Sequence, residues 1–128
     1  MGAITHIGPA VVRAGKTQPI SPAVVAEGAL VFVSGQVPMR DGQPAAPDIA
    51  GQTHVALDMI EAILERAGCT LADVVKATVW LVDGADYPAF NAAWGERFAP
   101  ETAPARSTVI SGLIAPVLVE IEAVAVRR

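Results

Sequence analysis

Two apolar segments near the C-terminal end of this 128-residue chain carry charged side chains that could do chemistry. Residues 104–109 read Pro-Ala-Arg-Ser-Thr-Val, and residues 118–124 read Leu-Val-Glu-Ile-Glu-Ala-Val. Such runs favour buried strands, where an ionised side chain needs either a partner or a function. Side chains alternate along a strand, so Arg106 and Thr108 share one face of the first segment. If the two strands pair, Arg106 and Glu120 would border one small pocket that holds an acid and a water together.

Arg106 has two interpretations at this point. As a binding residue, its planar guanidinium would hold a substrate carboxylate through two charge-assisted hydrogen bonds. As a structural residue, it would form an ion pair with Glu120 or Glu122. Glu120 is the candidate to orient or deprotonate a water, and one of the two glutamates is expected to be structural. Ser107 and Thr108 supply hydroxyls, but no histidine or lysine lies near them in the sequence, which gives a serine-type nucleophile little support.

The other reactive side chains do not cluster along the sequence. His6 and His54 stand alone, and no group of His, Cys and Asp residues has the spacing of a metal site. Cys69 is the single cysteine, so an intrachain disulfide is excluded and a buried, unreactive thiol is expected. No glycine-rich phosphate loop is present. We therefore expect no metal and no nucleotide cofactor.

The amino-acid composition limits the kinds of partner and assembly that the protein can have. Hydrophobic residues make up 52% of the chain and charged residues only 17%, which is apolar for so small a domain and predicts a homo-oligomer. The net charge of -4 and the absence of a basic run argue against nucleic acid as a partner. No signal peptide or membrane span is recognisable, so a cytoplasmic protein without a membrane partner is expected.

The N-terminal third predicts an irregular segment followed by strands. Residues 1–18 hold several Gly and Pro residues and predict an irregular lead-in, with one short strand at Val11–Arg13. The apolar runs 23–26 and 29–37 flank Glu27-Gly28 and predict a hairpin, whose second strand would be covered on both faces. Gly35, near the end of that run, would let a ligand or another backbone come close.

The rest of the chain alternates helices and strands. A helix is predicted from its cap Asp48 to Gly68, and a second helix from its cap Asp86 to Phe98. This order predicts an α+β fold in one domain over residues 1–128, with two helices on one face of a mixed sheet and a partner subunit on the other. The predicted strands are 74–82, 105–111 and 118–126.

Four of these segments resemble the RidA/YjgF family of reactive-intermediate deaminases. They are residues 33–38 (VSGQVP), 73–79 (DVVKATV), 104–109 (PARSTV) and 119–126 (VEIEAVAV), and the resemblance extends from about residue 19 to the C-terminus. It implies a chorismate-mutase-like fold assembled as a homotrimer, with sites in the clefts between subunits. It also implies hydrolysis of enamines and imines, of the 2-aminoacrylate and 2-iminopropionate type, to 2-keto acids and ammonia without a cofactor.

The resemblance also assigns roles to residues. Arg106 would bind the substrate carboxylate and Glu120 would position the attacking water. The other residues expected to bind substrate are Ser34, Gly35, Asn91, Ser107, Thr108 and Ile20, of which Ile20 and Asn91 would set the choice of side chain.

Three departures from the family pattern bear on substrate choice. Many deaminating members carry Tyr and then Gln where this chain reads Ile20-Ser21-Pro22, and many have Cys at the position of Thr108. The loop before Gly28 is one residue longer. Loss of the tyrosine hydroxyl is expected to change substrate choice or weaken proton handling.

Two other functions compete with the deaminase. One is a non-catalytic trimer that binds small molecules such as 2-keto acids, or acts as a chaperone, through the same clefts. The other is an endoribonuclease or translation inhibitor. It is the weakest of the three, because the chain has a net negative charge and lacks a basic groove for RNA.

Overall fold

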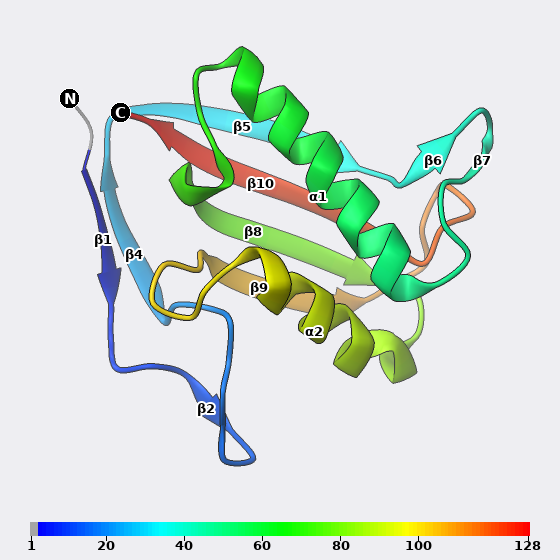
Figure 1. The fold of residues 1–128 in the computed structure, drawn as a ribbon, viewed down its shortest axis with the longest axis horizontal. Helices are drawn as coiled ribbons and strands as arrows, with labels where there is room; N and C mark the ends of the chain where they lie inside the picture. The colour runs from blue at the N-terminus through cyan, green and yellow to red at the C-terminus, as the bar shows by residue number, and fades with distance from the viewer. Residues whose placement is uncertain (1–2) are drawn as a thin grey trace.

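The protein is described over residues 3–128 by a computed structural model, which contains a mixed four-stranded sheet with two helices on one face (Figure 1). The order across the sheet is β5-β10-β8-β9. Strand β10 is antiparallel to both of its neighbours, whereas β9 is parallel to β8. This confirms the predicted α+β class and the placement of both helices on one face. The strands are β5 (Ala29–Gln36), β8 (Val74–Leu81), β9 (Ala105–Ile110) and β10 (Val119–Arg127).

Helix α1 (Ile49–Arg66) begins and ends where the sequence predicts. The Asp48 carboxylate accepts a hydrogen bond from the backbone N–H of Gly51 at 2.8 Å, which satisfies one of the free donors of the first turn. Gly68, at φ +78°, allows the left-handed turn after the helix end.

Helix α2 (Tyr87–Arg97) begins directly after Asp86, as the sequence predicts. Asp86 occupies the cap position, but its side chain makes no capping bond. Asp83 instead caps the preceding 3-10 turn η2 (Gly84–Asp86), accepting from the N–H of Ala85 at 2.9 Å. The short turn η1 (Leu71–Asp73) has the capping box that the sequence indicates.

The N-terminal segment is more regular than predicted. Strand β1 (Ala3–Ile7) pairs antiparallel with β4 (Ala23–Glu27), so the prediction of an irregular lead-in is wrong there. The short strand predicted at 11–13 is confirmed as β2 (Val12–Arg13), which pairs with β3 (Lys16–Thr17). A second small hairpin joins β6 (Met39–Arg40) to β7 (Gln43–Pro44).

The predicted hairpin between β4 and β5 does not form. Glu27 is paired with Ala3, so only Gly28 connects the two strands, and a hairpin needs at least two connecting residues. Gly28 has φ +134°, a conformation that only glycine adopts readily, and the chain turns a corner there. Strand β4 consequently runs along the end of the four-stranded sheet and leads up to the start of β5 (Figure 1).

One face of the four-stranded sheet is covered by the helices, and the other is exposed in the single chain. The face under the helices is the core, where Val79, Ile121 and Trp94 are fully buried. The opposite face, here called the open face, carries Phe32 at 73% exposure and Val109 at 43%. Burial of the second predicted strand on both faces is therefore wrong for the single chain. Among residues 3–128 no helix is long and apolar enough to cross a membrane.

Candidate functional site

The Arg106 side chain extends from β9 under helix α2. Its guanidinium carbon lies 5.8, 5.1 and 5.2 Å from the ring centroids of Tyr87, Phe90 and Trp94. These aromatic residues are three and four positions apart, so they form one stripe of the helix that faces the cation. Arg106 Nη2 also donates to the Tyr87 hydroxyl at 3.0 Å. The aromatic stripe of α2, in which Phe90 and Trp94 are fully buried, thus belongs to the core and also forms the wall around the cation.

Arg106 has no carboxylate partner among the described residues. Its Nε and Nη1 atoms are buried and make no hydrogen bond within residues 3–128. Burial lowers the pKa of Arg106, the Tyr87 hydroxyl opposes this shift, and the nearby charge of Arg13 lowers the pKa further. The ion pair with Glu120 or Glu122, considered from the sequence, is not formed. A buried guanidinium without a counter-ion is a site for an anion.

A pocket of about 400 Å³ opens beside this guanidinium and is here called the Arg106 pocket. None of its lining residues is acidic, and the Thr108 hydroxyl, on the same strand face as Arg106, is buried without a partner in the described chain. The pocket therefore offers cationic and hydroxyl donors with an apolar wall. Its lining residues are Arg13, Ile20, Tyr87, Arg106, Ser107 and Thr108.

Glu120 lies on the other face of the sheet. Strand β8 separates β9 from β10, so the two strands that carry Arg106 and Glu120 do not pair. Arg106 is level with Ala77, on the helix side, whereas Glu120 is level with Trp80, on the open face. Positions 77 and 80 of one strand point to opposite faces. The prediction that Arg106 and Glu120 border one pocket is therefore wrong within a single chain.

The Glu120 carboxylate rests against the backbone of β5. A Cβ added at Gly35 would collide with Glu120 Oε2, so glycine provides the space for this carboxylate. The pairing of β5 with β10 is shifted at this point, which is typical of a bulge. Ser34 lies next to it and lines a pocket of about 340 Å³ with Glu122. Glu120, Gly35 and Ser34 are thus grouped on the open face.

Comparison with known proteins identifies the family. A sequence model described as Endoribonuclease L-PSP matches residues 12–127. The 2-iminobutanoate/2-iminopropanoate deaminase of Escherichia coli K12 is 40% identical over 105 residues, covering 79% of this chain and 82% of that protein. The crystal structure of the E. coli YjgF gene product has a TM-score of 0.70 and 40% identity, covering 79% of this chain and 83% of that one. The chain belongs to the RidA/YjgF family.

A second named activity occurs among the family's members. The 3-aminoacrylate deaminase RutC of Acinetobacter baylyi is 41% identical to this RidA/YjgF chain over 116 residues, covering 87% of this chain and 91% of that protein. Both names refer to small carboxylic acids that carry a nitrogen, on the carbon next to the carboxylate in the 2-imino acids and one carbon further away in 3-aminoacrylate.

Asn91 is not part of the Arg106 pocket in this RidA/YjgF chain. Its Nδ2 donates to Gln18 Oε1 at 2.9 Å, while its Oδ1 is buried without a partner in the described residues. It lines a separate pocket of about 420 Å³ that also contains Lys16 and Gly95.

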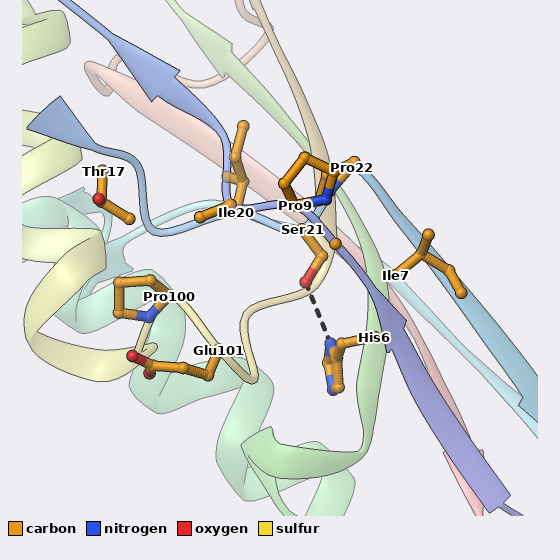
Figure 2. A pocket seen from close by; sticks show the side chains of 11 residues that line it. His6, Ile7, Pro9, Thr17, Ile20, Ser21, Pro22, Pro100 and Glu101 are labelled. Atoms are coloured by element: carbon orange, nitrogen blue, oxygen red, sulfur yellow. Dashed lines mark hydrogen bonds between the residues drawn. The ribbon is translucent and has the colours of Figure 1, made fainter. Parts of the chain in front are cut away.

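Figure 2 shows a further pocket, of about 330 Å³, beside the N-terminal segment. Ser21 and His6 meet in it at 3.1 Å, but the Ser21 hydroxyl donates to the Ala103 carbonyl and so is not activated by His6. Ile20 lines both this pocket and the Arg106 pocket, and is itself only 6% exposed. Ile20 therefore forms the wall between two cavities.

Sequence reasoning missed two residues of the Arg106 pocket. Tyr87 could have been found, because it lies three positions before Phe90 and so shares a face of the predicted second helix with it. Arg13 had no such signal, since a basic residue in an N-terminal turn is usually a solvated one. Within residues 3–128 no three His, Cys, Asp or Glu side chains are grouped as metal ligands.

Proposed function

We propose that this RidA/YjgF chain hydrolyses 2-imino acids and their enamine tautomers, of the 2-aminoacrylate and 2-iminopropionate type, to 2-keto acids and ammonia. Arg106 holds the substrate carboxylate and Glu120 positions the attacking water. The observation that carries the proposal is the buried Arg106 guanidinium, which faces a pocket and has no counter-ion in the described chain. The named activities of relatives near 40% identity support the same chemistry.

The proposal requires more than one copy of the chain. Because Arg106 and Glu120 lie on opposite faces of one sheet, the carboxylate beside a given Arg106 comes from a neighbouring subunit. The open face, with Phe32 at 73% exposure, supplies the apolar surface for such an assembly. We propose the homotrimer that the family resemblance implies, with the sites in its clefts.

The proposed reaction needs only a group that binds the substrate and a group that transfers protons. The water oxygen adds to the imine carbon, the carbon–nitrogen bond of the resulting carbinolamine breaks, and ammonia leaves as the carbonyl forms. Two charge-assisted hydrogen bonds from Arg106 to the carboxylate would contribute about 1.5–3 kcal/mol each and hold the imine in place. Glu120 takes a proton from the water and returns one to the departing nitrogen. Ile20 has no hydroxyl, but Tyr87 places a phenolic hydroxyl in the same pocket.

The test measures keto-acid formation from imines made in place by an amino-acid oxidase, with semicarbazide as the competing trap. Wild-type protein should suppress semicarbazone formation, and Arg106→Ala should lose at least about 100-fold in kcat/KM while remaining assembled. Imines from several amino acids, and 3-aminoacrylate, define the range. Equal turnover by wild type and Arg106→Ala would refute the proposal.

A non-catalytic binding protein is the second candidate. It is favoured by one observation, that no carboxylate of the described chain lies in the Arg106 pocket. In that case 2-keto acids would bind with the same Kd to wild type and Glu120→Gln, and neither would accelerate imine hydrolysis. The endoribonuclease in the family's description remains the weakest candidate because of the net charge of -4. RNA cleavage by the pure protein that disappears in Arg106→Ala would reverse this ranking.

A further inference from the structure

The Arg106 pocket contains a second arginine that the proposed reaction does not use. Arg13, an exposed residue of β2 in the N-terminal hairpin, lines it together with Arg106 of β9. The remaining lining residues are neutral, so two guanidinium groups share a pocket with hydroxyls and one isoleucine. One substrate carboxylate neutralises one of these two charges and leaves the other.

The hairpin that carries Arg13 is anchored in place. Ala14 and Gly15, with φ +50° and +76°, form the tight turn between β2 and β3. Directly after β3, the Gln18 N–H donates to the Val11 carbonyl at 2.7 Å, and the Gln18 side chain accepts from Asn91 on α2 at 2.9 Å. Gln18 is buried, so this link ties the hairpin to the helix that also holds Arg106.

The two cations are close enough to affect each other. Arg13 contributes to lowering the pKa of Arg106, in addition to the larger effect of burial. Two like charges that face one pocket repel each other when no anion is bound. A bound dianion cancels this repulsion and also neutralises the buried Arg106 cation. A monoanion relieves only part of the repulsion.

We propose that Arg13 is a specificity-determining residue that binds a second carboxylate, so that the preferred substrates are 2-imino dicarboxylic acids. This inference rests on the proposed function, because it assigns the first carboxylate to Arg106. The reacting carbon then lies between two anchored ends of the substrate, which restricts its orientation. Hydrolysis proceeds as before: water adds to the imine carbon, ammonia leaves, and a 2-keto dicarboxylic acid is released.

The first test compares two imines made in place: 2-iminosuccinate, from aspartate and an aspartate oxidase, and 2-iminopropanoate, from alanine and an amino-acid oxidase. The measured quantity is the ratio of kcat/KM for the dicarboxylic imine to that for the monocarboxylic imine. Arg13→Ala should lower this ratio by about 10- to 100-fold, the loss expected for one charge-assisted contact. Arg13→Lys keeps the charge and should retain part of the preference.

Lys16→Ala is the matched control. It removes the same charge from the partner strand of the same hairpin, but Lys16 lines a different pocket. It should leave the ratio within about twofold of the wild-type value, since exposed charges outside the site are screened by salt. An unchanged ratio in Arg13→Ala, or an equal fall in Lys16→Ala, would overturn the assignment of Arg13.

A binding measurement separates this inference from the proposed function. Calorimetric titration with 2-oxoglutarate and with 2-oxobutanoate compares a dicarboxylic and a monocarboxylic keto acid without any turnover. If wild type accelerates no imine, the deaminase proposal fails, and tighter binding of 2-oxoglutarate that is lost in Arg13→Ala still supports the second anion site. Equal binding of the two acids, or a preference that survives in Arg13→Ala, contradicts it.

Discussion

The two faces of the four-stranded sheet divide the proposed chemistry between them. On the helix-covered face, Arg106 is enclosed by the aromatic stripe of α2 and lacks a counter-ion in the described chain. On the open face, Glu120 is held in the space left by Gly35, beside exposed apolar side chains such as Phe32. Under the proposed function, each face holds one half of the hydrolytic site. The fold of one chain is enough to position the cation, whereas the proposed carboxylate partner would require assembly of several chains.

The largest expected effect comes from mixing two inactive variants. Arg106→Ala and Glu120→Gln subunits, co-expressed with different tags, should together recover about a quarter of wild-type activity, because each shared site needs one intact residue from each of two subunits. Each variant alone should be at least about 100-fold less active than wild type. Activity of the mixture is measured with the semicarbazide competition.

The control for this experiment is a mixture of Arg106→Ala and Arg106→Met subunits, which cannot complement each other. If the Arg106→Ala and Glu120→Gln mixture is no more active than this control, the division of the site between two subunits is wrong.

The open face is tested by placing a charge on it. Phe32→Asp should reduce the assembly to single chains, measured by light scattering, and lower activity by at least about 10-fold, because a carboxylate in an apolar interface is costly to bury. Val25→Asp makes the same kind of change on β4, at 57% exposure but outside this sheet, and should remain assembled. A fully assembled Phe32→Asp protein would show that partners do not cover this face.

A smaller loss is expected when the Glu120 carboxylate is displaced without being removed. The Cβ of Gly35→Ala would occupy the position of Glu120 Oε2, and the flexible carboxylate must move away. We expect kcat to fall by about 10-fold while the free energy of unfolding changes by less than about 1 kcal/mol. Gly112→Ala, which meets no atom within 4 Å, is the control. Unchanged kcat in Gly35→Ala would argue that the position of Glu120 does not matter.

The smallest effect is a gain in stability on the helix-covered face. Arg106→Met replaces a buried, unpaired cation by an apolar side chain of similar length, so the free energy of unfolding should rise by about 1 kcal/mol although activity is lost. Urea unfolding at one fixed protein concentration measures this. Arg40→Met, which changes an exposed arginine on β6, should stay within about 0.5 kcal/mol. A less stable Arg106→Met protein would mean that the cation stabilises the core.

Much of the fold could be predicted because its signals are local. The cap at Asp48, the helical spacing that follows it, and the β-branched runs at 74–82 and 118–126 depend on neighbours a few residues away. The predicted hairpin before β5 failed for a non-local reason. Glu27 is paired with Ala3 at the other end of the N-terminal segment, and this leaves Gly28 alone as the connection.

The helices, most strands, the family, and the candidates Arg106 and Glu120 could all be predicted from local sequence patterns. Three features became visible only in the folded chain: Arg106 and Glu120 lie on opposite faces, Tyr87 contacts the cation, and Arg13 lines the same pocket. The physical reason is that strand order and register are set by long-range pairing. Strand β8 lies between β9 and β10, and each of them is aligned with β8 in its own register. These two registers place Arg106 on one face of the sheet and Glu120 on the other, because side chains alternate between the faces.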